Sequence, residues 1–163
     1  MSRSISVLFV CLGNICRSPT AHAVFRSKVK EAGLQDQIVV DSAGTGSWHI
    51  GEPPDARSTE VAEQNGYDMS EIFARQVCTE DFDKFDYILA MDKENHNVLQ
   101  RLKTESGSVI LDYFMSFSKR TKRFDVPDPY FGTEGGFDHV LELIEGASDG
   151  LLDHVRQQLK PPF

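Results

Sequence analysis

The sequence predicts an α/β protein with a parallel sheet, and two patterns support this prediction. Short runs of β-favouring apolar residues alternate along the chain with stretches of helical periodicity, which is the order expected of strands joined by helical crossovers. The first run, residues 5–10, is a continuous β-rich segment, typical of a strand buried on both faces. Ligands of such folds bind at the carboxyl ends of the strands, so the residues that follow this run are the first candidates for a site.

The elements of the first half follow from capping signals and spacing. Ser18 and Pro19 are typical of a first helical turn. The apolar residues after them recur on one helical face as far as Gly33, which is expected to end the helix. The next predicted elements are a strand over residues 38–40, a Gly- and Pro-rich loop over residues 41–54 and a helix over residues 55–64.

The second half continues this alternation. Asp92 is placed to cap the helix that follows it, and an apolar stripe near the C-terminus predicts a closing helix that Gly146 and Gly150 could interrupt. The predicted elements are strands over residues 85–91 and 108–111, a long loop over residues 118–136 and a helix over residues 140–159. No internal repeat or linker divides the chain, so residues 1–163 are expected to form a single domain.

Charge and cysteine content limit the classes of partner. The formal net charge is -8, which argues against nucleic acid or an anionic membrane surface as the main partner. No apolar run approaches the roughly 20 residues of a membrane span. Cys11, Cys16 and Cys78 cannot all pair, and two of them lie in one short segment. Reduced thiols and a cytoplasmic location are therefore expected.

The segment from Cys11 to Arg17 has the composition of an anion-binding loop, and the positive end of the following helix points at it. Gly13 and Asn14 tolerate left-handed backbone conformations that turn successive amides toward one oxyanion, and Arg17 can bind two of its oxygens. This field would favour a nucleophilic thiolate at Cys11, although a cysteine at a strand end is often only a packed residue. The expected phosphate-binding residues are Leu12, Gly13, Asn14, Ile15, Cys16, Arg17 and Ser18.

Residues 10–19, Val-Cys-Leu-Gly-Asn-Ile-Cys-Arg-Ser-Pro, closely resemble the signature of the low-molecular-weight protein tyrosine phosphatases. Blocks that resemble the family in the same order follow over nearly the whole chain, at residues 41–45, 51–55, 74–77, 91–92 and 128–130. The resemblance implies a three-layer sandwich, an α/β fold with a four-stranded parallel sheet and helices on both faces. It also implies hydrolysis of phosphotyrosine-containing proteins, without a metal or cofactor, through a phosphocysteine intermediate at Cys11.

This chemistry needs an acid that protonates the leaving oxygen and then activates water. Among 25 acidic residues Asp128 stands out, because Pro127 and Pro129 stiffen its backbone, although such a segment in isolation is more often a simple turn. The resemblance assigns the general acid and base to Asp128, and Asp125 is the alternative if the loop lies differently. The expected catalytic residues are Cys11, Arg17 and Asp128.

Aromatic residues are expected beside the site. Trp48 lies in a Gly-rich loop, where it is either a surface lid on the core or, as the resemblance implies, a cleft wall that stacks on the substrate ring. The resemblance makes Tyr130 the facing wall, and His49 is interpreted as an exposed loop residue without a role. Ile15 favours phosphotyrosine, because relatives that act on phosphoarginine carry a threonine at this position.

The resemblance also implies residues that support the loop. Asn14 and Ser42 match a pair that holds the loop by hydrogen bonds, and Asp92 matches a residue that steadies Arg17, which is compatible with its capping a helix. At Ile72 the sequence departs from many members, which carry a histidine in this network. Either another group supports Asn14 or the loop is held less rigidly.

Alternatives stay open for the cysteines and for the function. Cys16 is either packed behind the loop or, as the resemblance favours, the partner of a reversible disulfide with Cys11 that prevents irreversible oxidation. Arsenate reductase, built on the same fold, would need two further redox cysteines, and only Cys78, which is expected to be inert, lies beyond the loop. A phosphopeptide-binding module would need no thiol at position 11. The chain is expected to be a monomer or a weak dimer.

Overall fold

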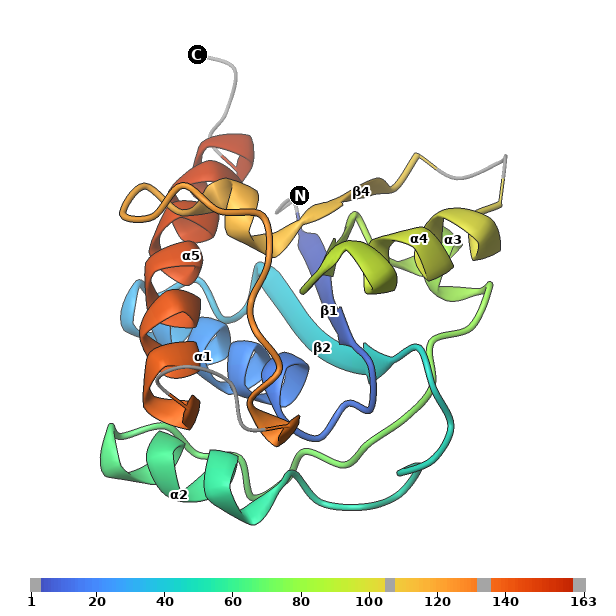
Figure 1. Cartoon of the computed structure of the whole chain (residues 1–163). Coiled ribbons are helices and arrows are strands. Elements are labelled where there is room, and N and C mark those ends of the chain that lie inside the picture. Colours follow the sequence, from blue (N-terminus) through green and yellow to red (C-terminus); the bar gives the residue numbers. More distant parts are fainter. Residues whose placement is uncertain (1–3, 105–107, 132–135, 160–163) are drawn as a thin grey trace.

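A computed structural model describes residues 4–104, 108–131 and 136–159 of the chain. It contains one sheet whose four strands are all parallel, in the order β2-β1-β3-β4. Figure 1 shows this sheet together with the helices that pack around it. The predicted four-stranded parallel sheet is therefore confirmed. The strands are β1 (Ile5–Cys11), β2 (Ile38–Gly44), β3 (Tyr87–Ala90) and β4 (Ile110–Tyr113).

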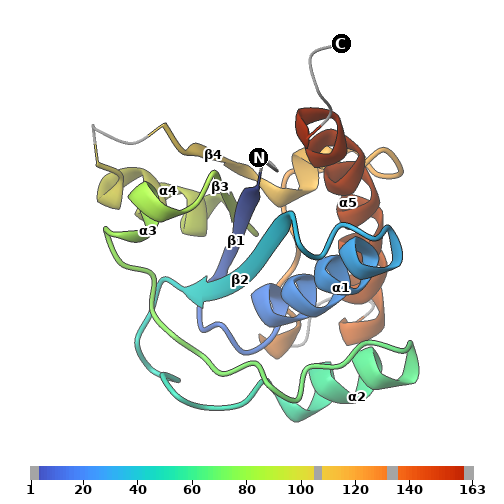
Figure 2. The ribbon, with the colours of Figure 1, turned by 180° about the vertical axis from the view of Figure 1, so that it is seen from behind.

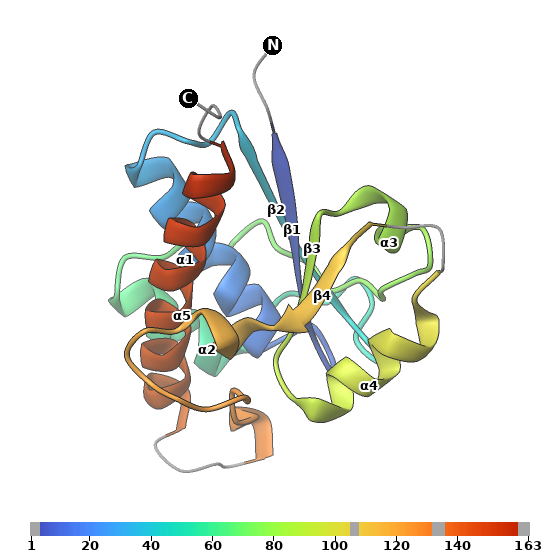
Figure 3. The same cartoon turned by 90° about the horizontal axis from the view of Figure 1, so that it is seen from above.

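Helices cover both faces of this sheet, as the resemblance implies. Seen from above, α1, α2 and α5 lie on one side of the strands, and α3 and α4 lie on the other (Figure 3). None of the helices within the described ranges is long and apolar enough to cross a membrane. The helices are α1 (Arg17–Glu31), α2 (Ala56–Gln64), α3 (Asp81–Lys84), α4 (Lys93–Leu102) and α5 (Gly136–Leu159), with 3₁₀ turns η1 (Phe114–Phe117) and η2 (Pro129–Phe131).

Strand β1 supplies the core on both faces, because successive side chains of a strand point to opposite sides. Val7 and Phe9 belong to the larger apolar cluster, under α1 and α5, and the ring of Phe9 meets the rings of Phe25 and Phe114 edge-on. Leu8 belongs to the smaller cluster on the opposite face. The central position of β1 is also visible from behind, where β2 is its neighbour (Figure 2).

The structure differs from the predicted boundaries in several places. The expected loop over residues 41–54 begins later, because residues 41–44 pair with β1 and extend β2 to Gly44. This polar, Gly-containing segment is held as a strand by its neighbour and not by its own composition. Strand β4 is shifted two residues beyond the predicted range, and helix α3 was not predicted. Of the predicted loop over residues 118–136, residues 132–135 lie outside the described residues.

The predicted C-terminal helix exists and continues through both glycines as α5. At Gly150 a Cβ atom would lie 1.7 Å from the carbonyl oxygen of Phe117, so the glycine lets η1 pack directly against the helix. The cost in helix propensity, about 1 kcal/mol relative to alanine, is accepted where a close approach requires it.

Candidate active site

The loop between β1 and α1 lies at the carboxyl end of the sheet, and its backbone turns at Asn14, which has a φ of 58°. This left-handed conformation was predicted for Gly13 as well, and for Gly13 the prediction is wrong, because its φ is not positive. Its lack of a side chain has a different reason. A Cβ atom there would lie 3.0 Å from Cδ2 of His49, so the glycine admits the imidazole above the loop.

The thiol of Cys11 is buried at the end of β1, and its Sγ atom lies 3.0 Å from Oγ of Ser18. Ser18 was expected to cap the following helix, but the helix begins at Arg17 and its N-cap residue is Cys16, which makes no side-chain cap bond. The Ser18 hydroxyl is instead free to face the thiol. It also accepts a hydrogen bond of 2.8 Å from Nδ2 of Asn14.

The guanidinium of Arg17 is almost completely buried, with 3% of its side chain exposed. Its Nη1 atom donates to Oδ2 of Asp92 at 2.6 Å and to the carbonyl of Val126 at 3.0 Å, and Nη2 lies 3.5 Å from Oδ2 of Asp128. Burial alone would lower the pKa of Arg17, but the charges of Cys11, Asp92 and Asp128 raise it, and the net shift is upward. Arg17 is therefore a fixed cation.

Asp92 both caps a helix and binds Arg17, the two roles that the sequence analysis considered for it. Its Oδ1 atom accepts from the amide of Asn95 at 2.8 Å and caps α4, while Oδ2 receives the bond from Arg17. The two oxygens of one carboxylate thus fix a helix and the arginine of the loop.

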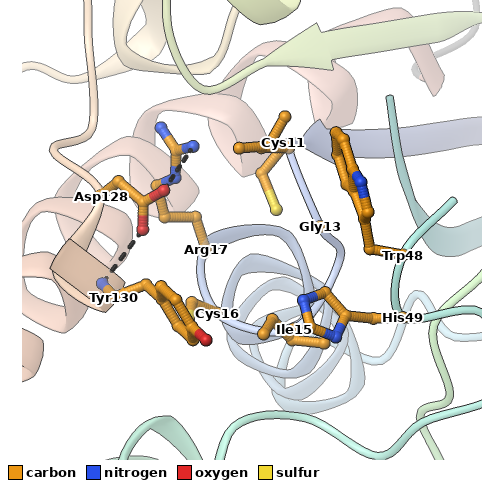
Figure 4. Close-up of a pocket in the computed structure, with 10 residues that line it drawn as sticks. Cys11, Gly13, Ile15, Cys16, Arg17, Trp48, His49, Asp128 and Tyr130 are labelled. Carbon is orange, nitrogen blue, oxygen red and sulfur yellow. Dashed lines mark hydrogen bonds and ion pairs between the residues drawn. The ribbon is translucent and has the colours of Figure 1, made fainter. Parts of the chain in front are cut away.

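Most residues of the loop border a cavity of about 260 Å³ (Figure 4). It brings together the three expected catalytic residues and both expected aromatic walls, whereas Asn14, Ser18, Ser42 and Asp92 do not line it. The lining residues are Cys11, Leu12, Gly13, Ile15, Cys16, Arg17, Trp48, His49, Asp128 and Tyr130.

The two candidate acids lie in different environments. Asp128 lines the cavity, and its Oδ1 atom accepts from the amide of Tyr130 at 3.1 Å, which fixes the carboxylate. Asp125 does not line this cavity and pairs with Arg123 at 3.1 Å. The geometry thus favours Asp128 over Asp125 as a group within reach of the thiol.

Two aromatic rings stand on opposite sides of the cavity (Figure 4). Trp48 is 70% exposed and Tyr130 is 43% exposed, so each offers a face to a bound ring. The guanidinium of Arg57, at the start of α2, lies 5.5 Å from the centre of the Tyr130 ring and 4.7 Å from that of Phe137. Asp55 holds Arg57 through both of its carboxylate oxygens. Helix α2 therefore supports one wall from outside.

His49 lines the cavity, although sequence reasoning gave it no role. Its Nδ1 atom pairs with Oε2 of Glu52, which orients the imidazole beside the loop. In the sequence, the only indication of this pair was that His49 and Glu52 lie three residues apart in a short loop.

Asn14 and Ser42, the expected supporting pair, each make hydrogen bonds behind the loop. Asn14 bonds Ser18 through Nδ2, and its Oδ1 accepts from the amide of Arg75 at 3.0 Å. Ser42 bonds Nδ1 of His22 at 2.9 Å, and no hydrogen bond joins it to Asn14 among the described residues. His22 had not been singled out, since a lone histidine on a helix gives no sequence signal.

Ile72 supplies no polar group to this region. It is buried in a small apolar cluster with Ala23, Ala62 and Met69. Position 72 therefore cannot provide the hydrogen bond that a histidine could make there.

The remaining cysteines differ in environment. Burial, opposed in part by a hydrogen bond from Ser58, raises the pKa of Cys16 to about 12, so its thiol is protonated at neutral pH. Cys78 is exposed, and its amide bonds the carboxylate of Asp81. Within the described ranges, no group of three or more His, Cys, Asp or Glu side chains is arranged to hold a metal ion.

Comparison with known proteins gives consistent matches. The family model "Low molecular weight phosphotyrosine protein phosphatase" matches residues 6–161. The low molecular weight protein-tyrosine-phosphatase YfkJ of Bacillus subtilis is 42% identical over 94% of this chain and 97% of its own length. The crystal structure of YfkJ, 40% identical, superposes with a TM-score of 0.91 over 98% of this chain and 99% of that chain.

Two further solved structures are informative. A protein tyrosine phosphatase from Entamoeba histolytica with Hepes in its active site has a TM-score of 0.90 and 38% identity, over 95% of this chain and 99% of that chain. An arginine phosphatase from Drosophila has a TM-score of 0.85 and 36% identity, over 92% and 97%. The same architecture thus occurs in proteins named for two different phosphoamino acids.

Proposed function

Because this chain belongs to the low molecular weight phosphotyrosine protein phosphatase family, we propose that it hydrolyses phosphotyrosine in proteins through a phosphocysteine intermediate at Cys11, with Asp128 as general acid and base. As a member of this family the chain is a metal-independent hydrolase, a protein-tyrosine-phosphatase. The observation that carries the proposed mechanism is the meeting of Cys11, Arg17 and Asp128 in one cavity.

In the first step the thiolate of Cys11 attacks phosphorus. The sulfur–phosphorus bond forms, the bond from phosphorus to the tyrosine oxygen breaks, and Asp128 gives its proton to that oxygen. Arg17 and the loop amides bind the remaining phosphate oxygens and stabilise their charge in the transition state. The fixed position of Arg17 means that little reorganisation is needed when the substrate binds.

In the second step the carboxylate of Asp128 takes a proton from water. The water oxygen attacks phosphorus, the sulfur–phosphorus bond breaks, and inorganic phosphate leaves. The Ser18 hydroxyl, 3.0 Å from Sγ, can donate to the thiolate that is released. Asp128 ends the cycle protonated again, so both steps balance.

The shape of the cavity supports an aromatic substrate. Trp48 and Tyr130 present ring faces on opposite sides, which suits a phenyl phosphate. Ile15 lines the same cavity and offers no hydroxyl to orient water. Both features favour phosphotyrosine over phosphoarginine.

We also propose that Cys16 protects the nucleophile. Peroxide would convert the Cys11 thiolate to a sulfenic acid, and the Cys16 thiol would then condense with it to form a disulfide and release water. The two thiols are both free and line one cavity, which supports this assignment.

The mechanism is tested with p-nitrophenyl phosphate in the presence of a chelator. Cys11→Ser is expected to abolish turnover while inorganic phosphate still binds in calorimetry. Asp128→Ala is expected to slow turnover by about 10²–10⁴-fold, and Asp125→Ala, the matched control, should leave it close to wild type. Turnover by Cys11→Ser would contradict the mechanism.

Specificity is tested with peptides that carry phosphotyrosine, phosphoserine or phosphoarginine in the same flanking sequence. A clear preference for phosphotyrosine is expected. Equal rates on all three would remove the roles given to Trp48, Tyr130 and Ile15.

A further inference from the structure

His22 is a buried titratable residue that the mechanism above does not use. It lies on α1 with 8% of its surface exposed, and Nδ1 is 2.9 Å from Oγ of Ser42, which is itself 2% exposed. Buried polar side chains are costly unless they are paired. The pair therefore specifies how α1 and β2 fit together.

Helix α1 bonds β2 at two consecutive residues. Ser18 and His22 are four residues apart and so lie on the same face of α1. The Ser18 hydroxyl lies 3.3 Å from the carbonyl oxygen of Ala43, and His22 bonds Ser42, the residue before it. The first two turns of α1 are thus attached to the last residues of β2.

The end of β2 forms the support beneath the loop. Gly44 is paired with Cys11 in the sheet, and the next amide, that of Thr45, donates to the Cys11 carbonyl at 2.9 Å. A Cβ atom at Gly44 would lie 2.8 Å from the carbonyl oxygen of Leu12 and 3.1 Å from the amide nitrogen of Asn14. At this spacing a displacement of β2 must also displace the loop backbone.

We propose that His22 is a positioning residue: its bond to Ser42 holds the end of β2 against the loop and so keeps Cys11 and Ser18 in the geometry that binds phosphate. This inference rests on the proposed function for the role of the loop. This support is additional to the hydrogen bonds that Asn14 makes with Ser18 and with the amide of Arg75, and neither involves Ile72.

The action of His22 is geometric and not electrostatic. Burial, with a smaller contribution from the charge of Arg26, lowers the pKa of His22 to about 4. The imidazole is therefore neutral at the pH of an assay and adds no positive charge to the loop. Removing the His22 side chain should disturb distances within the loop but leave the net charge of the loop unchanged.

The test compares His22→Ala, His22→Asn and Ser42→Ala with a matched control. Asparagine is the conservative variant, because its amide group can occupy the place of Nδ1 and bond Ser42. The control is His154→Ala, which removes another histidine whose ring bonds a core side chain, Tyr87, at 3.1 Å. Tyr87 is the first residue of β3 and so lies at the end of this parallel strand that is opposite to the loop.

Two readouts do not require turnover: the affinity for inorganic phosphate in calorimetry, and the rate at which iodoacetate alkylates Cys11, followed by peptide mass spectrometry. His22→Ala and Ser42→Ala should each lower both by about tenfold, as expected for one buried hydrogen bond, and the double variant should lose little more. His22→Asn should recover most of the loss, and His154→Ala should bind phosphate like the wild type.

Phosphate affinity and alkylation within twofold of wild type in His22→Ala, or equal losses in His22→Ala and His154→Ala, would overturn the proposal. A wild-type protein that binds phosphate but lacks phosphatase activity would contradict the proposed function instead, and the two readouts would still decide the role of His22.

Discussion

At the scale of the residue, the carboxylate of Asp92 connects helix α4 with Arg17 of the loop. Oδ1 of Asp92 caps α4 and Oδ2 binds the guanidinium of Arg17. Leaving a buried cation without its partner is costly, so Arg17 depends on Asp92 for its position. The same residue makes the helix and the anion site structurally dependent on one another.

Two variants of Asp92 distinguish its role as the cap of α4 from its role as the partner of Arg17. Asp92→Asn keeps an oxygen that can cap α4 but removes the negative charge from Arg17, whereas Asp92→Ala removes both. Both are expected to lose about 10–100-fold in kcat/KM, and Asp92→Ala should be less stable than Asp92→Asn by about 1 kcal/mol in urea unfolding. Equal stability of the two variants, or full activity of Asp92→Asn, would contradict this division.

The second residue-scale prediction concerns pH. A histidine in the unfolded chain has a pKa of about 6.5, and burial lowers the pKa of His22 to about 4 in the folded protein. Between these pKa values the unfolded state binds more protons than the folded state. The contribution of His22 to the free energy of unfolding is therefore complete above pH 6.5 and is lost as the pH falls toward 4.

The free energy of unfolding should therefore fall more steeply with acidification in the wild type than in His22→Asn, by about 2 kcal/mol at pH 4.5. Urea unfolding of both proteins at pH 7.5 and pH 4.5 measures the difference. Parallel losses would mean that His22 is protonated in the folded protein.

At the scale of the element, the glycines of α5 give a matched pair. A Cβ atom at Gly150 would meet backbone, the Phe117 carbonyl, at 1.7 Å, whereas one at Gly146 would lie 3.2 Å from the flexible arm of Arg120. Gly150→Ala is expected to destabilise the fold by about 1–3 kcal/mol or more. Gly146→Ala should be neutral or stabilising by up to about 1 kcal/mol, since alanine favours the helix. Thermal unfolding of both variants decides the matter, and similar effects would contradict the packing of η1 on α5.

The elements also show how far the sequence could predict this fold. The apolar run that becomes β1 and the helical stripe that becomes α5 were predicted because their own periodicity determines them. Residues 41–44 were missed as a strand because their pairing with β1, and not their composition, holds them extended. The same holds for the site: the Cys11 loop follows from local spacing, whereas the bond between His22 and Ser42 joins two elements and has no local pattern.

At the scale of the whole molecule, the chain must bind an anion although its formal net charge is -8. The positive charge is local, at the buried Arg17 that ends the loop, while the acidic surface repels anions at longer range. For a phosphotyrosine peptide flanked by glutamates, kcat/KM should rise about two- to threefold as salt screens this repulsion between 20 and 200 mM. A lysine-flanked peptide should show the opposite trend. A fall for both peptides would mean that attraction by the loop extends well beyond the cavity.

The central position of β1 affects how fast different parts of the site can open. Cys11, the proposed nucleophile, ends a strand that is paired on both sides and buried except at Ser6, which is half-buried. Asp128 and Tyr130 belong to a segment outside the sheet, which contacts the rest of the protein through side chains and through the bond from the Val126 amide to the Met91 carbonyl. Amide exchange should therefore be slowest in β1, where it requires global unfolding, and much faster around residues 124–130, which can open locally. In the proposed mechanism, this segment can open to release each tyrosine product while the residues that bind phosphate stay in place.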